Sequence, residues 1–191
     1  MKKKLLIIIL FFGFFSYGKA ETSRIFDGKE NAKIIIIAYE SLTCSHCADF
    51  HKDIYPLLKK DYIDKGLVKI EFRHFPLDVA AFNASKIAQC GKDQGLEILD
   101  NLYLNQQKWV TGNTIEELNN NLKNFLKKSN FNLNFESCIN DKKIEDFVLN
   151  DRIEGAKNFD VNATPTIIIN NKKFDKTLNY KNLKKILEKM I

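Results

Sequence analysis

Residues 34–47 read IIIIAYESLTCSHC, an apolar run that leads into two cysteines three positions apart. A continuous apolar run of this length is typical of a strand that is covered on both faces of its sheet. The cysteines open a predicted helix over residues 44–64, with Cys44 at the helix end and Cys47 one turn inside. A helix N-terminus favours a thiolate over a thiol because its backbone N–H groups are unpaired. The pattern therefore predicts a pair of redox-active cysteines.

A zinc site is the main alternative for a Cys-x-x-Cys pair. Structural zinc has four ligands, usually completed by a second such pair or by two histidines at short spacing. The remaining cysteines, Cys90 and Cys138, are far apart in the sequence and form no second pair of this kind. The spacing and the change from strand to helix favour redox chemistry, and we expect no metal.

Residues 1–20 have the pattern of a secretory signal peptide. A basic start, Lys2-Lys3-Lys4, precedes an apolar stretch over residues 5–15, and Gly18-Lys19-Ala20 fits a cleavage site. This apolar stretch is shorter than the roughly 20 residues that a membrane span needs, although an uncleaved anchor is the alternative. We expect export to the periplasm, where structural disulfides persist.

The charge balance gives no indication of a nucleic-acid partner. The formal net charge is +6, but four lysines and no acid precede Glu21, so residues 21–191 carry 26 basic and 24 acidic groups. A nearly neutral chain without a basic stripe does not have the composition of a nucleic-acid-binding protein. Residues 21–191 have the length of one ordinary domain, and we expect a monomer.

Strand and helix patterns alternate along the rest of the chain. Pro56 should kink the helix that follows the cysteines, and the strands on either side of that helix should be parallel. Further strands are predicted at residues 24–26, 67–75, 166–169 and 172–174. Further helices are predicted at residues 79–90, 96–108, 114–128, 141–159 and 179–191.

These features resemble the DsbA-like branch of the thioredoxin superfamily. The resemblance rests on Cys44-Ser45-His46-Cys47 after a strand, on the helical insertion, and on Ala163-Thr164-Pro165-Thr166 before a late strand. It implies an α/β protein with a thioredoxin fold and an inserted helical domain. Residues 21–77 and 160–191 would form the thioredoxin-like domain, and residues 78–159 the helical one. The implied activity is thiol–disulfide exchange, with the Cys44–Cys47 disulfide in place of any cofactor.

His46 lies between the two cysteines, where its imidazole can donate to the Cys44 sulfur or lie near it. The alternative is an exposed loop histidine without effect. His51, in contrast, is predicted on the solvated face of the helix. Ser45 stands where the best-known family member has a proline, which leaves the reduction potential open.

Pro165 is a further residue that the resemblance assigns to the active site. The superfamily has a cis proline that faces the cysteine pair, whereas a trans proline at a strand start is the commoner case. A cis bond would present the Thr164 backbone to an incoming extended peptide. By resemblance, Thr164 and Pro165 are substrate-binding residues.

Cys90 and Cys138 match a subgroup that has a second cysteine pair. Two leftover cysteines in an exported protein usually form a structural disulfide, although two buried free thiols are the alternative. Glu40 has two interpretations. The family buries an acid beneath the active-site disulfide, usually at the position of Ala38 here, so Glu40 either relays protons to Cys47 or caps the turn over residues 41–43.

The predicted function is that of a periplasmic thiol:disulfide oxidoreductase that introduces disulfides into reduced, unfolded exported proteins. By resemblance, a quinone-linked membrane oxidase would reoxidise it. A disulfide isomerase or reductase is one alternative, although isomerases of this superfamily carry an additional N-terminal dimerisation domain. A surface-exposed, non-catalytic binding protein on the same scaffold is the other.

Overall fold

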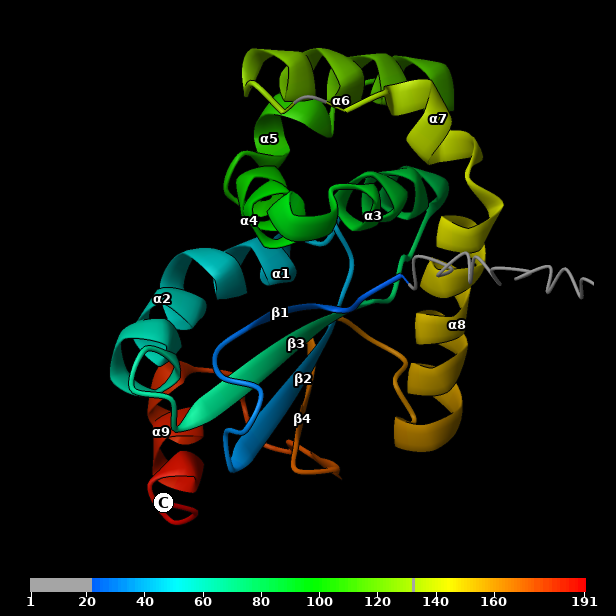
Figure 1. Cartoon of the computed structure of the whole chain (residues 1–191). Helices are drawn as coiled ribbons and strands as arrows, with labels where there is room; N and C mark the ends of the chain where they lie inside the picture. The colour runs from blue at the N-terminus through cyan, green and yellow to red at the C-terminus, as the bar shows by residue number, and fades with distance from the viewer. Residues whose placement is uncertain (1–21, 132) are drawn as a thin grey trace, which may run out of the picture.

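The computed structural model describes residues 22–131 and 133–191, so the predicted signal peptide lies outside the described residues. The described chain forms a five-stranded sheet in the order β1-β3-β2-β4-β5 (Figure 1). The strands are β1 (Ile25–Asp27), β2 (Ile34–Glu40), β3 (Val68–His74), β4 (Thr166–Ile169) and β5 (Lys172–Lys173).

The apolar strand β2 lies at the centre of this sheet. It pairs in parallel with β3, where Ile36 lies opposite Ile70, and antiparallel with β4. Ile36 packs into the core on one face of the sheet, and Ile37 packs into a second cluster on the other. Burial on both faces explains why the strand lacks alternation between polar and apolar residues.

The segment after the cysteines is helical but irregular. It begins with α1 (Ser45–Asp49), continues through a π-helical turn (Phe50–Ile54) into α2 (Tyr55–Leu58), and ends in a second π-helical turn (Lys59–Ile63). Pro56 lies in the first turn of α2, because it has no N–H to donate to the preceding turn. The predicted kink takes the form of π-helical turns around the proline.

Helices follow one another from residue 79 to residue 159. They are α3 (Val79–Cys90), a 3-10 turn (Lys92–Gln94), α4 (Gly95–Leu104), α5 (Gln106–Trp109), α6 (Ile115–Lys128), α7 (Phe135–Asn140) and α8 (Lys142–Phe159). The predicted helix at 96–108 is interrupted at Asn105, which separates α4 from α5. The short α7 had no counterpart in the sequence prediction.

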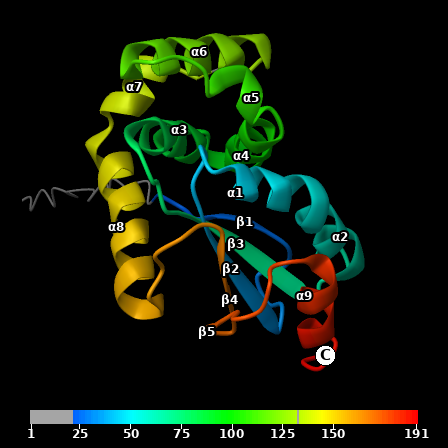
Figure 2. The same cartoon turned by 180° about the vertical axis from the view of Figure 1, so that it is seen from behind.

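Helices cover both faces of the sheet (Figures 1 and 2). The segment from α1 to α2 and the closing α9 (Tyr180–Leu187) lie on one face, and the long α8 lies on the other. Helix α8 comes very close to the sheet at Gly155, where a Cβ would lie 2.7 Å from the Tyr39 ring. Helices α3 to α7 gather beyond the end of β2 that leads into α1.

This architecture confirms the thioredoxin fold with a helical insertion. Helix α8, which falls within the predicted 78–159 unit, contacts β3 as well as α3 and therefore belongs to the packing of both parts. Among the described residues, no helix is long and apolar enough to span a membrane. The same part of the chain shows no cluster of three or more histidine, cysteine or acidic side chains that could hold a metal ion.

Candidate active site

Cys44 and Cys47 lie where the central strand passes into α1. Cys44 precedes the first residue of α1 with extended backbone dihedral angles, and its carbonyl accepts the first hydrogen bonds of the helix, from the N–H groups of Cys47 and Ala48. Both cysteines are free thiols; Cys44 is half-buried and Cys47 is buried. Only the first sulfur is therefore open to a large reaction partner.

The environment of Cys44 strongly favours its thiolate. A hydrogen bond from the Cys47 thiol is the largest influence; burial opposes it, and the Thr164 side chain and the backbone N–H groups of Cys47 and His46 add to it. Together they lower the pKa of Cys44 to about 5. Cys44 is therefore ionised at neutral pH.

The environment of Cys47 favours its neutral thiol instead. Burial raises the pKa of the Cys47 thiol far above its ordinary value, and the hydrogen bond to Cys44 and the charge of Glu40 raise it further. The pair thus consists of one stable thiolate and one stable thiol. In a disulfide between them, attack at Cys44 would release a strongly basic sulfur at Cys47 that must take up a proton.

The cis peptide bond between Thr164 and Pro165 lies directly beside Cys44. The Cys44 sulfur is 3.3 Å from the Thr164 carbonyl oxygen, the acceptor for its thiol form. Next to it is an open groove of about 340 Å³, which we call the proline groove. It is lined by His46, Asp49, Phe50, Asp53, Ile54, Thr164, Pro165 and Leu178.

His46 contributes to the site in a different way from that expected. Its side chain is 82% exposed, and its Nδ1 lies 3.6 Å from Asp49 Oδ2. The part of His46 that stabilises the Cys44 thiolate is its backbone N–H. His46 instead contributes to the lining of the proline groove.

The loop that carries Cys44 is fastened to the helical insertion. The Gln106 amide donates to the carbonyl oxygens of Leu42 at 2.8 Å and Cys44 at 3.1 Å. The Thr43 hydroxyl donates to Asp78 at 2.6 Å, at the start of α3. No sequence pattern indicates this role of Gln106, because only the tertiary fold brings α5 to this loop.

Glu40 lies buried at the end of β2, and its side chain turns to His51 rather than to the following turn. Glu40 Oε2 is 2.9 Å from His51 Nε2, and His51 Nδ1 is 2.7 Å from Asp100 Oδ1. The prediction that His51 is solvated is wrong, since its side chain is completely buried. His51 follows Cys47 by four positions on one helix face, and the buried Tyr55 follows by four more, a spacing that would have indicated burial.

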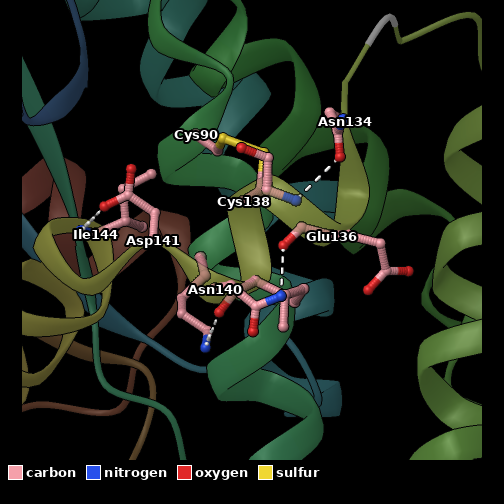
Figure 3. The surroundings of a disulfide bond; sticks show 10 residues. Cys90, Asn134, Glu136, Cys138, Asn140, Asp141 and Ile144 are labelled. Atoms are coloured by element: carbon pink, nitrogen blue, oxygen red, sulfur yellow. Dashed lines mark hydrogen bonds between the residues drawn. A yellow bond between two sulfur atoms is a disulfide. The ribbon is translucent and has the colours of Figure 1, made fainter.

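Cys90 and Cys138 form a disulfide that is separate from the active site (Figure 3). The bond joins the end of α3 to α7. Asn134 caps the start of α7, and its side chain accepts from the Ser137 N–H at 3.0 Å. The disulfide thus anchors a helix of only six residues, which would be marginal by itself.

Comparisons with known proteins agree with this architecture. The Thioredoxin family model matches residues 19–189. A Rickettsia conorii chain named as a protein-disulfide oxidoreductase is 30% identical over 145 residues, which cover 75% of this chain and 52% of that relative. The chain thus spans about half the length of this curated relative.

Two further proteins match along most of their length. Disulfide bond formation protein D of Bacillus subtilis is 26% identical over 172 residues, which cover 85% of this chain and 74% of that protein. The crystal structure of Wolbachia pipientis α-DsbA1 superposes with a TM-score of 0.75 at 29% identity, covering 86% of this chain and 88% of that one.

Proposed function

We propose that this chain, which belongs to the thioredoxin family and is DsbA-like within it, is a thiol:disulfide oxidoreductase that donates its disulfide to reduced exported proteins. The observation that carries the proposal is the opposite behaviour of the two active-site sulfurs. Cys44 is a half-buried thiolate with a pKa of about 5, and Cys47 is a buried thiol with a raised pKa. The names of the relatives support the same class of reaction.

The reaction begins with the Cys44–Cys47 disulfide. A client thiolate attacks the Cys44 sulfur, the bond to Cys47 breaks, and Cys47 leaves with the electron pair and takes up a proton. A second client thiolate then attacks the client sulfur of the mixed disulfide and releases Cys44. Two electrons have passed from the client to the cysteine pair, and the client holds a new disulfide.

The direction of net transfer follows from the stability of the product. The released Cys44 thiolate is stabilised by the Cys47 thiol, the Thr164 side chain and two backbone N–H groups. Stabilising the reduced form makes the disulfide more oxidising. The stabilised Cys44 thiolate favours a dithiol oxidase over a reductase.

The proline groove is proposed as the client platform. An extended peptide that passes Pro165 would place its cysteine beside Cys44, because the Thr164 backbone is 3.3 Å from that sulfur. The Thr164 backbone could form main-chain hydrogen bonds to such a peptide, and bonds of this type depend little on the side chains of the peptide. Thr164, Pro165 and His46 would therefore bind and orient clients, with Cys44 as the catalytic sulfur.

The proposed function also requires that the protein is exported and that another protein reoxidises it. Export to the periplasm rests on the pattern of residues 1–20 and would give access to unfolded clients. Each turnover leaves the pair reduced, so a quinone-linked membrane oxidase is the proposed source of oxidant. The protein is proposed to act as a monomer.

Turnover with a reduced, unfolded client of known disulfide pattern tests the proposal. The oxidised protein should form client disulfides within one turnover, measured by mass spectrometry of alkylated samples. The Cys44→Ser variant should be inactive, whereas a Cys90→Ser/Cys138→Ser variant should retain activity. Failure to oxidise the client, with efficient repair of a scrambled client, would instead indicate an isomerase. Failure in both assays would favour the non-catalytic alternative.

A further inference from the structure

Three titratable side chains lie in a row beneath the active-site cysteines. Glu40 is at the end of β2, His51 is in the π-helical turn after α1, and Asp100 is in α4. The imidazole bridges the two carboxylates, with N–O distances of 2.9 Å to Glu40 and 2.7 Å to Asp100. The exposed fractions of the side chains are 2% for Glu40, 0% for His51 and 31% for Asp100. The row therefore leads from the buried acid towards the surface.

Aromatic rings hold the His51 imidazole in this position. The ring stacks on Tyr103 at 4.2 Å between centroids and contacts Phe72 at 5.1 Å and Tyr55 at 5.5 Å. Phe50 lies at 5.7 Å as well. Among the described residues of α4, β2, β3 and the helical segment after Cys44, the ionised groups that act on the ring are Glu40 and Asp100.

The two carboxylates favour the doubly protonated imidazole. Burial of the ring opposes the charge, but Glu40 and Asp100 outweigh it and raise the pKa of His51 to about 9. Each ring nitrogen is within hydrogen-bond distance of one carboxylate oxygen, which is the arrangement that an imidazolium with two donors requires.

Glu40 receives two opposing influences. Burial is the larger influence and raises the pKa of its carboxyl group above the ordinary value, while the attraction to His51 and its hydrogen bond limit that rise. The second oxygen, Oε1, is buried and has no hydrogen-bond partner among the described residues. Glu40 also raises the pKa of Cys47 through its charge, so the two groups are electrostatically coupled. A buried carboxylate that has an oxygen free to accept, and that is coupled by charge to a buried thiol, can serve as the base for that thiol.

We propose that His51, oriented by Asp100, is a positioning residue that keeps Glu40 ionised as the base for Cys47. The inference rests on the proposed function and concerns the step that re-forms the active-site disulfide. A mixed disulfide joins Cys44 to a partner sulfur, and the Cys47 thiol gives its proton to Glu40. The Cys47 sulfur bonds to Cys44, and the bond from Cys44 to the partner breaks. The partner leaves as a thiolate with the electron pair, so the cysteine pair is oxidised and the partner is reduced.

Dithionitrobenzoate isolates this step without any client protein. The Cys44 thiolate releases one thionitrobenzoate and becomes a mixed disulfide, and Cys47 then displaces a second thionitrobenzoate. The rate of the second release, followed by stopped-flow absorbance against pH, reports on deprotonation of Cys47. Glu40→Gln should slow it by about 100-fold at neutral pH, the low end for general acid–base catalysis.

His51→Gln tests the positioning role, because glutamine can donate to Glu40 but carries no charge. Without the cation, burial raises the pKa of Glu40 further, so the rise of the rate with pH should move to higher pH. At pH 7 the second release should slow by at least about tenfold. The Glu40→Gln/His51→Gln double variant should be no slower than Glu40→Gln alone, because both changes act on one base.

Matched controls separate this effect from general loss of structure. Glu97→Gln removes an exposed carboxylate from α4, one turn before Asp100. His74→Gln removes a second buried histidine, which lies opposite Glu40 in the pairing of β2 with β3 but whose Nε2 is 3.2 Å from Gln89 Oε1. Neither substitution should shift the pH dependence of the second thionitrobenzoate release. His51→Lys restores a cation, so its profile should lie nearer to that of the wild type than the profile of His51→Gln.

The ionisation of His51 can also be observed in the unaltered protein, which avoids any variant that fails to fold. Both ring nitrogens should have the ¹⁵N chemical shifts of an imidazolium between pH 5 and pH 8. A neutral imidazole in that range, or an unshifted profile in His51→Gln, would overturn the inference. Because no client takes part, either result is independent of whether the protein oxidises exported proteins.

Discussion

The Cys44 sulfur and the Thr164 carbonyl oxygen lie 3.3 Å apart, although 120 positions separate the two residues in the chain. The contact joins the segment that follows β2 to the segment that precedes β4, and these two strands are neighbours in the sheet. It places the nucleophilic sulfur beside a backbone that precedes the strand. Sheet topology thus brings the reactive sulfur and the proposed peptide-binding surface together.

The Cys44 thiol of the reduced protein should be strongly acidic. Thiolate absorbance should show a transition near pH 5, because the Cys47 thiol, the nearby Thr164 side chain and the helix backbone N–H groups stabilise the charge. A second transition for Cys47 should be absent below the pH at which the protein unfolds. A Cys44 transition near its ordinary value of about 8.5 would contradict this account of the site.

The same pKa makes the stability of the reduced protein depend on pH. The folded pKa of Cys44 is below the unfolded value, so the stabilisation is complete above the unfolded pKa and is lost as pH falls towards about 5. The difference in unfolding free energy between the reduced protein and its Cys44→Ser variant should therefore grow from pH 5 to pH 8. Urea denaturation at several pH values measures it, and a constant difference would argue against a stabilised thiolate.

Thr164→Val removes a hydroxyl next to the active-site sulfur with little change in shape. The Thr164 side chain lowers the pKa of Cys44, so the variant should have a higher thiolate transition and a less oxidising disulfide. Absorbance titration and equilibration with glutathione check the two effects. Thr166→Val is the control, because its hydroxyl donates to the Ala163 carbonyl oxygen instead. Equal effects of both substitutions would point to general loosening of this loop.

Gln106→Ala should release the loop that carries Cys44. The amide donates to two backbone carbonyl oxygens, and the loss should cost about 1–2 kcal/mol of unfolding free energy. Hydrogen exchange at residues 42–44 should become faster. The neighbouring Gln107 is exposed, and Gln107→Ala should leave both quantities unchanged. Unchanged exchange in Gln106→Ala would show that the loop is held in another way.

Removing the second disulfide should affect stability rather than chemistry. Its cysteines are separated by 48 positions, and closing a loop of this size stabilises by up to about 4 kcal/mol. Cys90→Ser/Cys138→Ser should melt at a lower temperature in a calorimeter and keep its oxidase activity. Complete loss of activity in a folded variant would mean that this pair relays electrons.

Asp100→Asn tests the row of titratable side chains, Glu40, His51 and Asp100, that lies beneath the active-site cysteines. Asp100 raises the pKa of His51 through a hydrogen bond and through its charge. In the variant, the His51 imidazolium should therefore lose its proton at lower pH than in the wild type. NMR titration of the imidazole measures the change. A His51 titration that remains at about pH 9 would show that Glu40 alone sustains the charge.

The sequence was sufficient for features that local chemistry specifies. The apolar run of β2 and the Cys-x-x-Cys spacing indicated the sheet centre and the redox pair, and the resemblance indicated the fold. His51 was misplaced because a histidine next to exposed Lys52 and Asp53 looks solvated until its partners are known. Those partners, Glu40 and Asp100, come from another strand and another helix. Only the folded chain brings them together.

Two other features depended in the same way on tertiary structure. Helix α7 is short and begins at a polar cap, so its sequence has no strong periodicity, and its disulfide to α3 is what holds it. Gln106 has no local signal for its contact with the active-site loop. His46 lines the proline groove with a largely exposed side chain, although its position between two cysteines suggested contact of the imidazole with sulfur.

The reduction potential of the Cys44–Cys47 pair tests the central claim most directly. The protein is equilibrated with mixtures of reduced and oxidised glutathione, and the oxidised fraction is counted by alkylation and mass spectrometry. A stabilised Cys44 thiolate predicts a potential less negative than roughly −200 mV, so that the disulfide is passed on to clients. A potential near about −270 mV, the value of thioredoxin, would make the protein a reductant and would contradict the account.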